Sequence, residues 1–323
     1  MSIPLKQDSL KVSVVSVPSV LRKSKLSMQQ PLLSSLRNSL FLSPHNMSVT
    51  LAVPSGAIHG VSIVSDALVV SGKSTLFFYR LEQSATTTYI AIVPTTVHLP
   101  PSFEVSFVHQ DRLICNSKDQ SQLFHLMSQT SSHTPSCRCC CVISAMQVVL
   151  GGDEGFFLYE NESCSQVIHT PSAVMSLAAS ESALFVGCRS GVVYRWDFKT
   201  RLLKRHTRCR HAVIAMAVMD DLVCTIDAAG IVKINNQRIN LRNAHCICQD
   251  DDHLLIGLRD QVVCVDWTGC VCSTLPIPNV RFIASWNHFF VLASDDSHFR
   301  AVAKRGYLIQ QTSLFVICLQ TRH

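Results

Sequence analysis

Short apolar runs, each ending in a turn of small or polar residues, follow one another along the chain from about residue 48. The clearest unit is 184–197, LFVGCRSGVVYRWD, where an apolar run, a polar turn closing on Gly191 and an alternating Val-Val-Tyr-Arg-Trp run are consecutive. This pattern predicts a β-hairpin whose first strand is fully buried and whose second is partly buried. Few windows place apolar residues three and four positions apart over ten residues, so helices are not expected.

The same apolar run recurs seven times. The runs begin at Leu68, Leu113, Val148, Leu184, Leu222, Leu254 and Phe290, at intervals of 45, 35, 36, 38, 32 and 36 residues. Apolar strands precede these hairpins, as at 173–178, 212–218 and 280–285, and weaker strands follow them, as at 202–206 and 269–274. Four strands per repeat are the content of a propeller blade. We therefore predict an all-β, seven-bladed β-propeller over residues 48–323. A β-sandwich is the alternative, although it does not require seven equal units.

The chain resembles the WD-repeat family at a few positions. Tyr194-Arg195-Trp196-Asp197 looks like the dipeptide that ends the third strand of such a blade, and Val265-Asp266 occupies the equivalent place two repeats later. The first strands of three repeats open with a histidine, where the family usually has Gly-His: His59, His211 and His245. The resemblance covers roughly residues 56–313 and implies a divergent, WD-repeat-like propeller. Only one repeat contains Trp-Asp, and no repeat contains Gly-His in that order. The family's Asp–His–Ser/Thr–Trp hydrogen-bond network is therefore expected to be incomplete in most blades.

Two details of the ring follow from the same comparison. WD-repeat propellers usually borrow one strand from the opposite terminus, so we expect one of the apolar segments 49–53 and 314–319 to complete the seventh blade. Residues 128–136, SQTSSHTPS, are predicted to be a loop where the outer strand of blade two should lie.

Composition narrows the class of protein. Hydrophobic residues make up 47% of the 323 and charged residues 15%, which excludes a mainly disordered chain. No run approaches eighteen apolar residues, so no membrane span is expected. The fifteen cysteines are odd in number and no signal-peptide core precedes them, which favours a reducing, cytoplasmic or nuclear setting.

The first 47 residues differ from the rest. They hold eleven serines, six lysines or arginines and a single acid, Asp8, for a net charge of +5 out of +6 for the chain. This composition predicts a basic, flexible tail. A mitochondrial transit peptide is the alternative, since such peptides are rich in Ser and Arg and poor in acids.

A second cationic segment lies inside the predicted propeller. Six cations and no acid occupy residues 199–210: Lys199, Arg201, Lys204, Arg205, Arg208 and Arg210. One interpretation is that these charges keep the outer strand of a blade from pairing with the edge of another sheet. The family geometry offers another, because it places second-to-third-strand turns and blade connections on one face. Arg189 would then approach Arg208 and Arg210, with Arg259 on a neighbouring blade. An acidic rim would lie across the ring, formed by Asp153, Glu154, Asp295 and Asp296.

A face polarised in this way is suited to an acidic or phosphorylated partner segment, because Arg binds carboxylate and phosphate through two parallel hydrogen bonds. We expect a non-catalytic scaffold that mediates protein–protein interactions within a multiprotein complex, with these eight basic residues as candidate contacts. The alternatives are an enzyme with its site in the central channel, and a propeller that binds RNA or phospholipid. Base stacking has no platform between Phe198 and His211, where Phe, Tyr and Trp are absent.

No chemical motif predicts catalysis or a cofactor. Gly72-Lys73-Ser74 lacks the earlier glycine of a phosphate-binding loop, and Gly151–Gly155 is interpreted as a hairpin turn. Cys137, Cys139 and Cys141 would share one face of a strand, but the paired spacing of structural zinc sites is missing, so no metal is expected. Nine other cysteines are predicted to be small apolar residues in strands: Cys115, Cys188, Cys224, Cys246, Cys248, Cys264, Cys270, Cys272 and Cys318.

Overall fold

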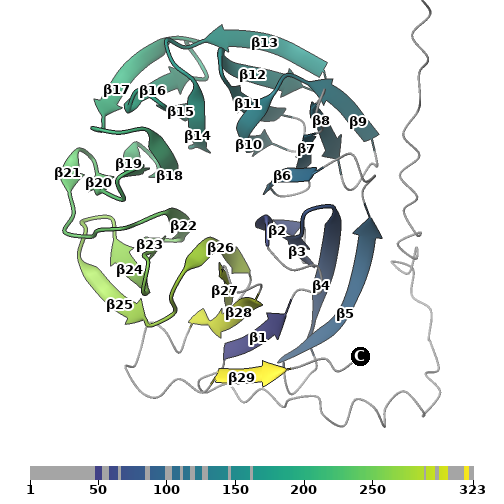
Figure 1. Cartoon of the computed structure of the whole chain (residues 1–323). Coiled ribbons are helices and arrows are strands. Elements are labelled where there is room, and N and C mark those ends of the chain that lie inside the picture. Colours follow the sequence, from purple (N-terminus) through teal and green to yellow (C-terminus); the bar gives the residue numbers. More distant parts are fainter. Residues whose placement is uncertain are drawn as a thin grey trace, which may run out of the picture.

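The computed structural model describes residues 48–52, 58–64, 67–83, 88–98, 104–109, 112–116, 121–125, 130–144, 147–160, 163–286, 289–294, 298–304 and 316–319. Every element in these ranges is a β-strand. The strands form seven sheets arranged as blades around a central axis (Figure 1). Within the same ranges, no helix is long and apolar enough to cross a membrane. The expected tail, residues 1–47, lies outside the described residues.

Each blade follows the chain from the centre outward. Blade one has β2 (Gly60–Val64), β3 (Ala67–Ser71), β4 (Thr75–Gln83) and β5 (Thr88–His98). Blade two has β6 (Glu104–His109), β7 (Arg112–Asn116), β8 (Ser121–His125) and β9 (Thr130–Thr134). Blade three has β10 (Cys137–Ser144), β11 (Gln147–Gly152), β12 (Gly155–Glu160) and β13 (Ser163–His169). Blade four has β14 (Val174–Ala179), β15 (Ala183–Cys188), β16 (Val192–Asp197) and β17 (Leu203–Arg208).

The remaining blades follow the same plan. Blade five has β18 (Val213–Met219), β19 (Leu222–Asp227), β20 (Val232–Ile234) and β21 (Gln237–Arg238). Blade six has β22 (Cys246–Asp250), β23 (His253–Gly257), β24 (Val262–Asp266) and β25 (Val271–Leu275). Blade seven has β26 (Val280–Trp286), β27 (Phe289–Ser294) and β28 (His298–Ala303), with β1 (Ser48–Ala52) and β29 (Val316–Leu319) beyond them.

The predicted seven-bladed, all-β architecture is confirmed. Each of the seven apolar runs forms the second strand of a blade, and these strands are buried because a neighbouring blade covers each of their faces. β15 is buried at all six positions, whereas β16 is only partly buried. Clusters of buried side chains fill the space between adjacent blades, and the innermost strands contact one another around the ring.

Side-chain hydrogen bonds link the innermost strands of neighbouring blades. Ser176 Oγ in β14 donates to the carbonyl of Val213 in β18 at 3.0 Å. Cys246 Sγ in β22 donates to the carbonyl of Val280 in β26 at 3.2 Å, and the His245 ring contacts the same oxygen. These contacts fix the rotation between successive blades, and therefore the positions of their loops.

Both terminal segments join blade seven. β1 pairs antiparallel with β28 and so completes the blade, as predicted for one of the two segments. β29 then pairs parallel with β1, so the blade has a fifth strand that was not predicted. The physical reason is that a fourth strand still presents an unpaired edge of backbone donors and acceptors.

The prediction of a loop at 128–136 was wrong. Within it, residues 130–134 form β9, which pairs with β8 from Ser121↔Thr134 to His125↔Thr130. An outer strand is held by backbone hydrogen bonds along one edge and needs no apolar alternation. A polar segment of Ser and Thr can therefore form an outer strand, since Thr also favours extended backbone.

Candidate functional site

The turn between β15 and β16 lies against the connection from blade four to blade five. The Cys209 amide donates to the carbonyl of Gly191 at 2.7 Å, and the Arg189 amide donates to the carbonyl of Ala173 at 2.8 Å. The loops that carry Arg189, Arg208 and Arg210 are thereby brought together at one end of blade four. All three side chains are exposed. We call this end of blades four to six the turn face.

Blade five adds one exposed cation to the turn face, Arg242, in the connection that contacts Gly230 through the Ala244 amide, whereas its β19–β20 turn carries no charge. That turn is Ala228-Ala229-Gly230, and it is folded by the buried carboxylate of Asp227, whose Oδ1 accepts from the amides of Ala229 at 3.0 Å and Ile231 at 3.1 Å. Arg259 is exposed in the equivalent turn of blade six, where its carbonyl accepts from the Asn279 amide at 2.8 Å. Blade five therefore stands between Arg259 and the arginines of blade four.

The cationic segment extends along the whole height of blade four. Lys199 and Arg201 lie in the turn from β16 to β17, at the end opposite Arg189, and Lys204 and Arg205 lie within β17. The Arg201 guanidinium is 5.1 Å from the centroid of the Trp196 ring. The eight candidate residues are thus not gathered at one place. All eight are exposed, and none forms an ion pair with another described residue.

The expected acidic rim is weaker than its sequence indicates. Asp153 forms an ion pair with Arg138 of the same blade at 2.9 Å, which offsets its charge. Glu154 is exposed beside it. Asp295 and Asp296 lie outside the described residues.

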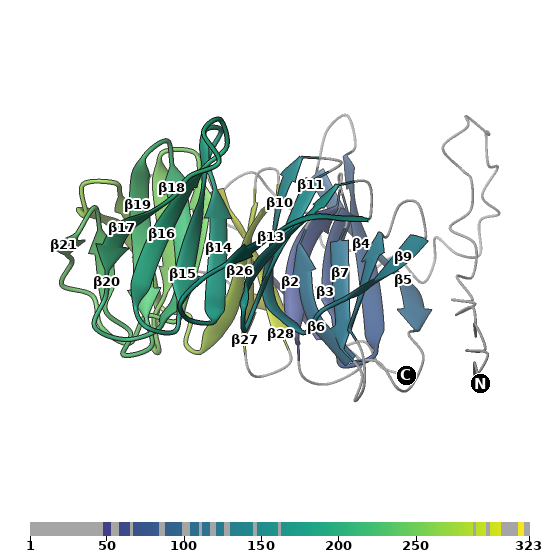
Figure 2. The ribbon, with the colours of Figure 1, turned by 90° about the horizontal axis from the view of Figure 1, so that it is seen from above.

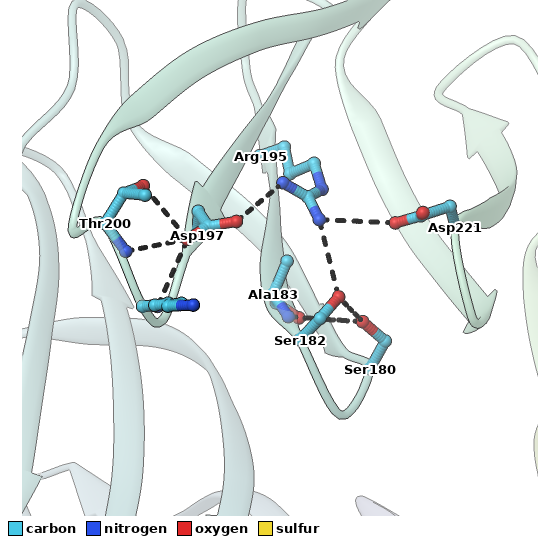
Figure 3. Close-up of polar contacts among 8 residues, drawn as sticks. Ser180, Ser182, Ala183, Arg195, Asp197, Thr200 and Asp221 are labelled. Carbon is cyan, nitrogen blue, oxygen red and sulfur yellow. Dashed lines mark hydrogen bonds and ion pairs between the residues drawn. The ribbon is translucent and has the colours of Figure 1, made fainter.

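Two carboxylates at the ends of third strands organise the turns that follow. Asp197 ends β16, and its Oδ1 accepts from the Thr200 amide at 2.8 Å and the Thr200 hydroxyl at 2.9 Å (Figure 3). Its Oδ2 accepts from Arg195 at 3.0 Å, and Arg195 reaches on to Asp221 of blade five at 3.3 Å. Asp266 ends β24 and accepts from the Thr268 hydroxyl at 2.6 Å. The equivalence of Asp197 and Asp266 was predicted from the sequence, and it is confirmed.

The stability supplied by the Asp197 carboxylate should depend on pH. The Thr200 amide, the Thr200 hydroxyl and Arg195 lower the pKa of Asp197 from 3.8 to about 2. Because the folded pKa is the lower one, the charge stabilises the fold above pH 3.8, and this contribution disappears as the pH falls toward 2. Asp197→Asn keeps an oxygen acceptor without the charge. Urea midpoints of the two proteins should differ by a constant amount from pH 5 to 7 and converge below pH 4. A constant difference down to pH 2 would contradict this assignment.

The cysteine cluster in β10 does not converge on one point. The strand has a β-bulge between Cys137 and Cys139, which changes the alternation of its side chains. Cys139 and Cys141 pack toward blade four, whereas Cys137 and Cys140 pack toward blade two. The expectation that Cys137, Cys139 and Cys141 share a face was therefore wrong. Burial raises the pKa of Cys137 to about 11 and that of Cys141 to about 12, so these thiols stay protonated at neutral pH.

The other cysteines divide into two groups. As predicted, several are buried in strands: Cys115, Cys188, Cys224, Cys246 and Cys264. Cys248 is half-buried, and Cys270 and Cys272 are exposed on the outer side of blade six, so for these two the prediction was wrong. The Cys318 side chain lies outside the described residues. Among the described residues, no three His, Cys, Asp or Glu side chains are placed to hold a metal ion.

One polar cluster was not predicted from the sequence. Between blades six and seven, Lys304 Nζ lies 2.7 Å from Ser285 Oγ, and both donate to Asp250 Oδ1 at 2.5 Å. A serine beside a lysine can form a nucleophile and base pair, but such a lysine must be uncharged to take a proton. Here Lys304 forms an ion pair with Asp250, and the three groups link blades six and seven.

Comparison with known proteins supports the fold alone. The chain is similar to the crystal structure of the computationally designed Ika8 protein, with a TM-score of 0.58 and 13% identity over 80% of this chain and 99% of that one. It is also similar to the crystal structure of BamB from Moraxella catarrhalis, with a TM-score of 0.55 and 14% identity over 77% of this chain and 86% of that one. No protein-family model and no curated protein sequence matches the chain. The protein is a seven-bladed β-propeller, and its resemblance to WD repeats stays a prediction.

Proposed function

We propose that this propeller is a non-catalytic scaffold that binds acidic or phosphorylated segments of partner proteins through its turn face, within a multiprotein complex. The observation that carries the proposal is the gathering of exposed Arg189, Arg208 and Arg210 by the Gly191–Cys209 backbone contact. A guanidinium binds carboxylate and phosphate through two parallel hydrogen bonds, and several of them on a rigid ring recognise an anionic segment without prior rearrangement. Propellers commonly present loops on a rigid frame for contacts of this kind.

The proposal includes a cytoplasmic or nuclear location. Its support is the chemistry of the thiols, because the fourteen cysteines whose side chains the structure describes are all free. Free thiols in this number are typical of a reducing compartment.

Charge reversal on the turn face tests the proposed function. The probe is a fluorescent acidic peptide of alternating Glu and Gly, titrated at low salt. The double substitution Arg189→Glu and Arg210→Glu should weaken binding by about tenfold or more, because two attractive contacts become repulsive. The control is Lys199→Glu with Arg205→Glu, which changes the net charge equally on exposed residues away from the turn face.

The two double variants separate the surface from the net charge. Equal weakening by both would mean that only overall charge matters, and it would overturn the assignment of the turn face. Unchanged binding in both would overturn the proposed function. Thermal unfolding of each variant checks that the ring is intact.

A further inference from the structure

Blade five has an unusually small outer part. β20 contains three residues and β21 contains two, whereas the outer strands on either side, β17 and β25, contain six and five. At the outer edge of the interface between blades four and five, Lys204, His206 and Arg238 are exposed and Lys233 is half-buried. Figure 1 shows β21 beside β17 at the rim of the ring, and Figure 2 shows these strands from the side. We call this edge the seam. Three cations of the seam form no ion pair with another described residue: Lys204, Lys233 and Arg238.

Register places the three cations on facing surfaces. Lys233 of β20 lies directly opposite Arg238 of β21 and beside Thr225, whose hydroxyl is 3.4 Å from Cys209 Sγ of the connection from blade four. Lys233 and Arg238 therefore face blade four. Cα partners share a face, so Lys204 lies on the same side of its sheet as Arg195 and Phe185, which packs against Met216 and Val218 of blade five.

The cations at the seam outnumber the acids beside it. Like charges directly opposite each other on a two-stranded ribbon are unfavourable, which applies to Lys233 and Arg238. The nearby carboxylates, Asp197 and Asp221, share the single guanidinium of Arg195, so these three groups together carry a charge of −1 against the three cations. His206 also lies on this side, against Phe185, and desolvation together with the charge of Arg195 lowers its pKa. Among the described residues, none forms an ion pair with Lys204, Lys233 or Arg238.

The seam is continuous with the turn face. Lys233 Nζ donates to the carbonyl of Arg208 at 3.0 Å, which places this ammonium next to the backbone of a turn-face residue. The Thr207 hydroxyl contacts the Asn236 side chain and so fastens the hairpin of blade five to β17. An extended segment bound on the turn face can pass over Arg208 and continue along the seam.

We propose that the seam binds phosphate groups on the partner segment and makes the scaffold prefer the phosphorylated form of its partner. This inference rests on the proposed function and names the modification that the docking surface selects. A phosphorylated side chain carries a charge of about −1.5 to −2 at pH 7, so it offsets the opposed pair Lys233 and Arg238. A carboxylate carries one charge and offsets only one of them.

The surroundings of the seam favour a phosphorylated protein over RNA. The 68 residues from 199 to 266 contain no Phe, Tyr or Trp, so blade five and its flanks offer no aromatic surface for bases. Single-stranded RNA binding depends on such stacking, about 1–3 kcal/mol per base. A phosphopeptide requires only cations and backbone contacts.

The experiment compares one acidic peptide in unphosphorylated and doubly phosphorylated forms. The full-length protein should bind the phosphorylated form about tenfold more tightly. Lys204→Gln with Arg238→Gln should remove most of this preference while leaving affinity for the unphosphorylated peptide within about twofold. Arg205→Gln with Lys199→Gln is the matched control, because Arg205 neighbours Lys204 in β17 but lies on the opposite side of the sheet, and it should keep the preference.

Each remaining outcome overturns a specific statement. If the seam variant keeps the preference while the turn-face reversal still abolishes peptide binding, the seam assignment is wrong and the proposed function stands. If neither peptide binds the unsubstituted protein, the proposed function itself fails. If poly(U) RNA, or vesicles containing anionic phospholipid, bind more tightly than the phosphopeptide and lose binding in the seam variant, the partner is not a phosphorylated protein.

Discussion

Trp196→Ala should lower the free energy of unfolding by about 3–5 kcal/mol, the usual effect of removing a large aromatic side chain from a packed interior. Trp196 is 1% exposed in the cluster that joins blades three and four. Its ring meets Phe156 and Phe198 edge to face, each at a centroid distance of 5.6 Å, and Arg201 covers it from outside. Removing the ring therefore leaves a cavity between two blades that the rigid ring cannot close.

Urea unfolding followed by circular dichroism measures this effect. Val167→Ala is the control, since Val167 lies in the outer strand of the adjoining blade with 45% of its surface exposed, and its loss should change stability by less than about 0.5 kcal/mol. If Trp196→Ala does not fold, Trp196→Phe keeps part of the ring and should show a smaller loss. Similar midpoints for the alanine variants at both positions would mean that this interface contributes little.

The second strand of each blade could be predicted because burial on both faces requires a continuous run of apolar residues. Runs such as LFVG at 184–187 must be apolar at every position, so they stand out in the sequence. Outer strands carry no such requirement. β9 is polar, β17 is cationic and β21 has two residues, and each is defined by backbone pairing that side-chain type does not reveal. The terminal strands that join blade seven could not be assigned from the sequence for the same reason, because β29 pairs with β1 through the unpaired backbone edge of that strand.

The candidate site was predictable only in part. The density of cations at 199–210 is plain in the sequence, and the turn that brings Arg189 to Arg210 follows from the repeat pattern. The division of those cations between the two ends of blade four requires the strand bounds. Lys233 and Arg238 are separated in sequence by a turn, and their opposition becomes visible only through cross-strand register. The bulge that separates the β10 thiols is likewise a backbone feature.

The turn face depends on one glycine. Gly191 has φ +80°, in the left-handed region, and a Cβ there would lie 2.6 Å from the carbonyl oxygen of Cys209 and 2.8 Å from that of His211. Both neighbours are backbone atoms of the connection that carries Arg210, so they cannot move aside as a side chain would. Gly191→Ala should therefore destabilise the protein by about 2–4 kcal/mol, from left-handed strain together with overpacking.

Gly269→Ala provides the matched comparison for this prediction. Gly269 has φ +89°, but its added Cβ would meet Ile239 Cδ1 at 3.1 Å, the flexible end of a side chain. Gly269→Ala should lower the free energy of unfolding by about 1–2 kcal/mol, from backbone strain alone. Because the Gly191 turn also sets the distance between Arg189 and Arg210, Gly191→Ala should weaken acidic-peptide binding under conditions where the variant is folded, and Gly269→Ala should not. Equal unfolding midpoints for the two variants would show that backbone contact at Gly191 does not hold the turn face together.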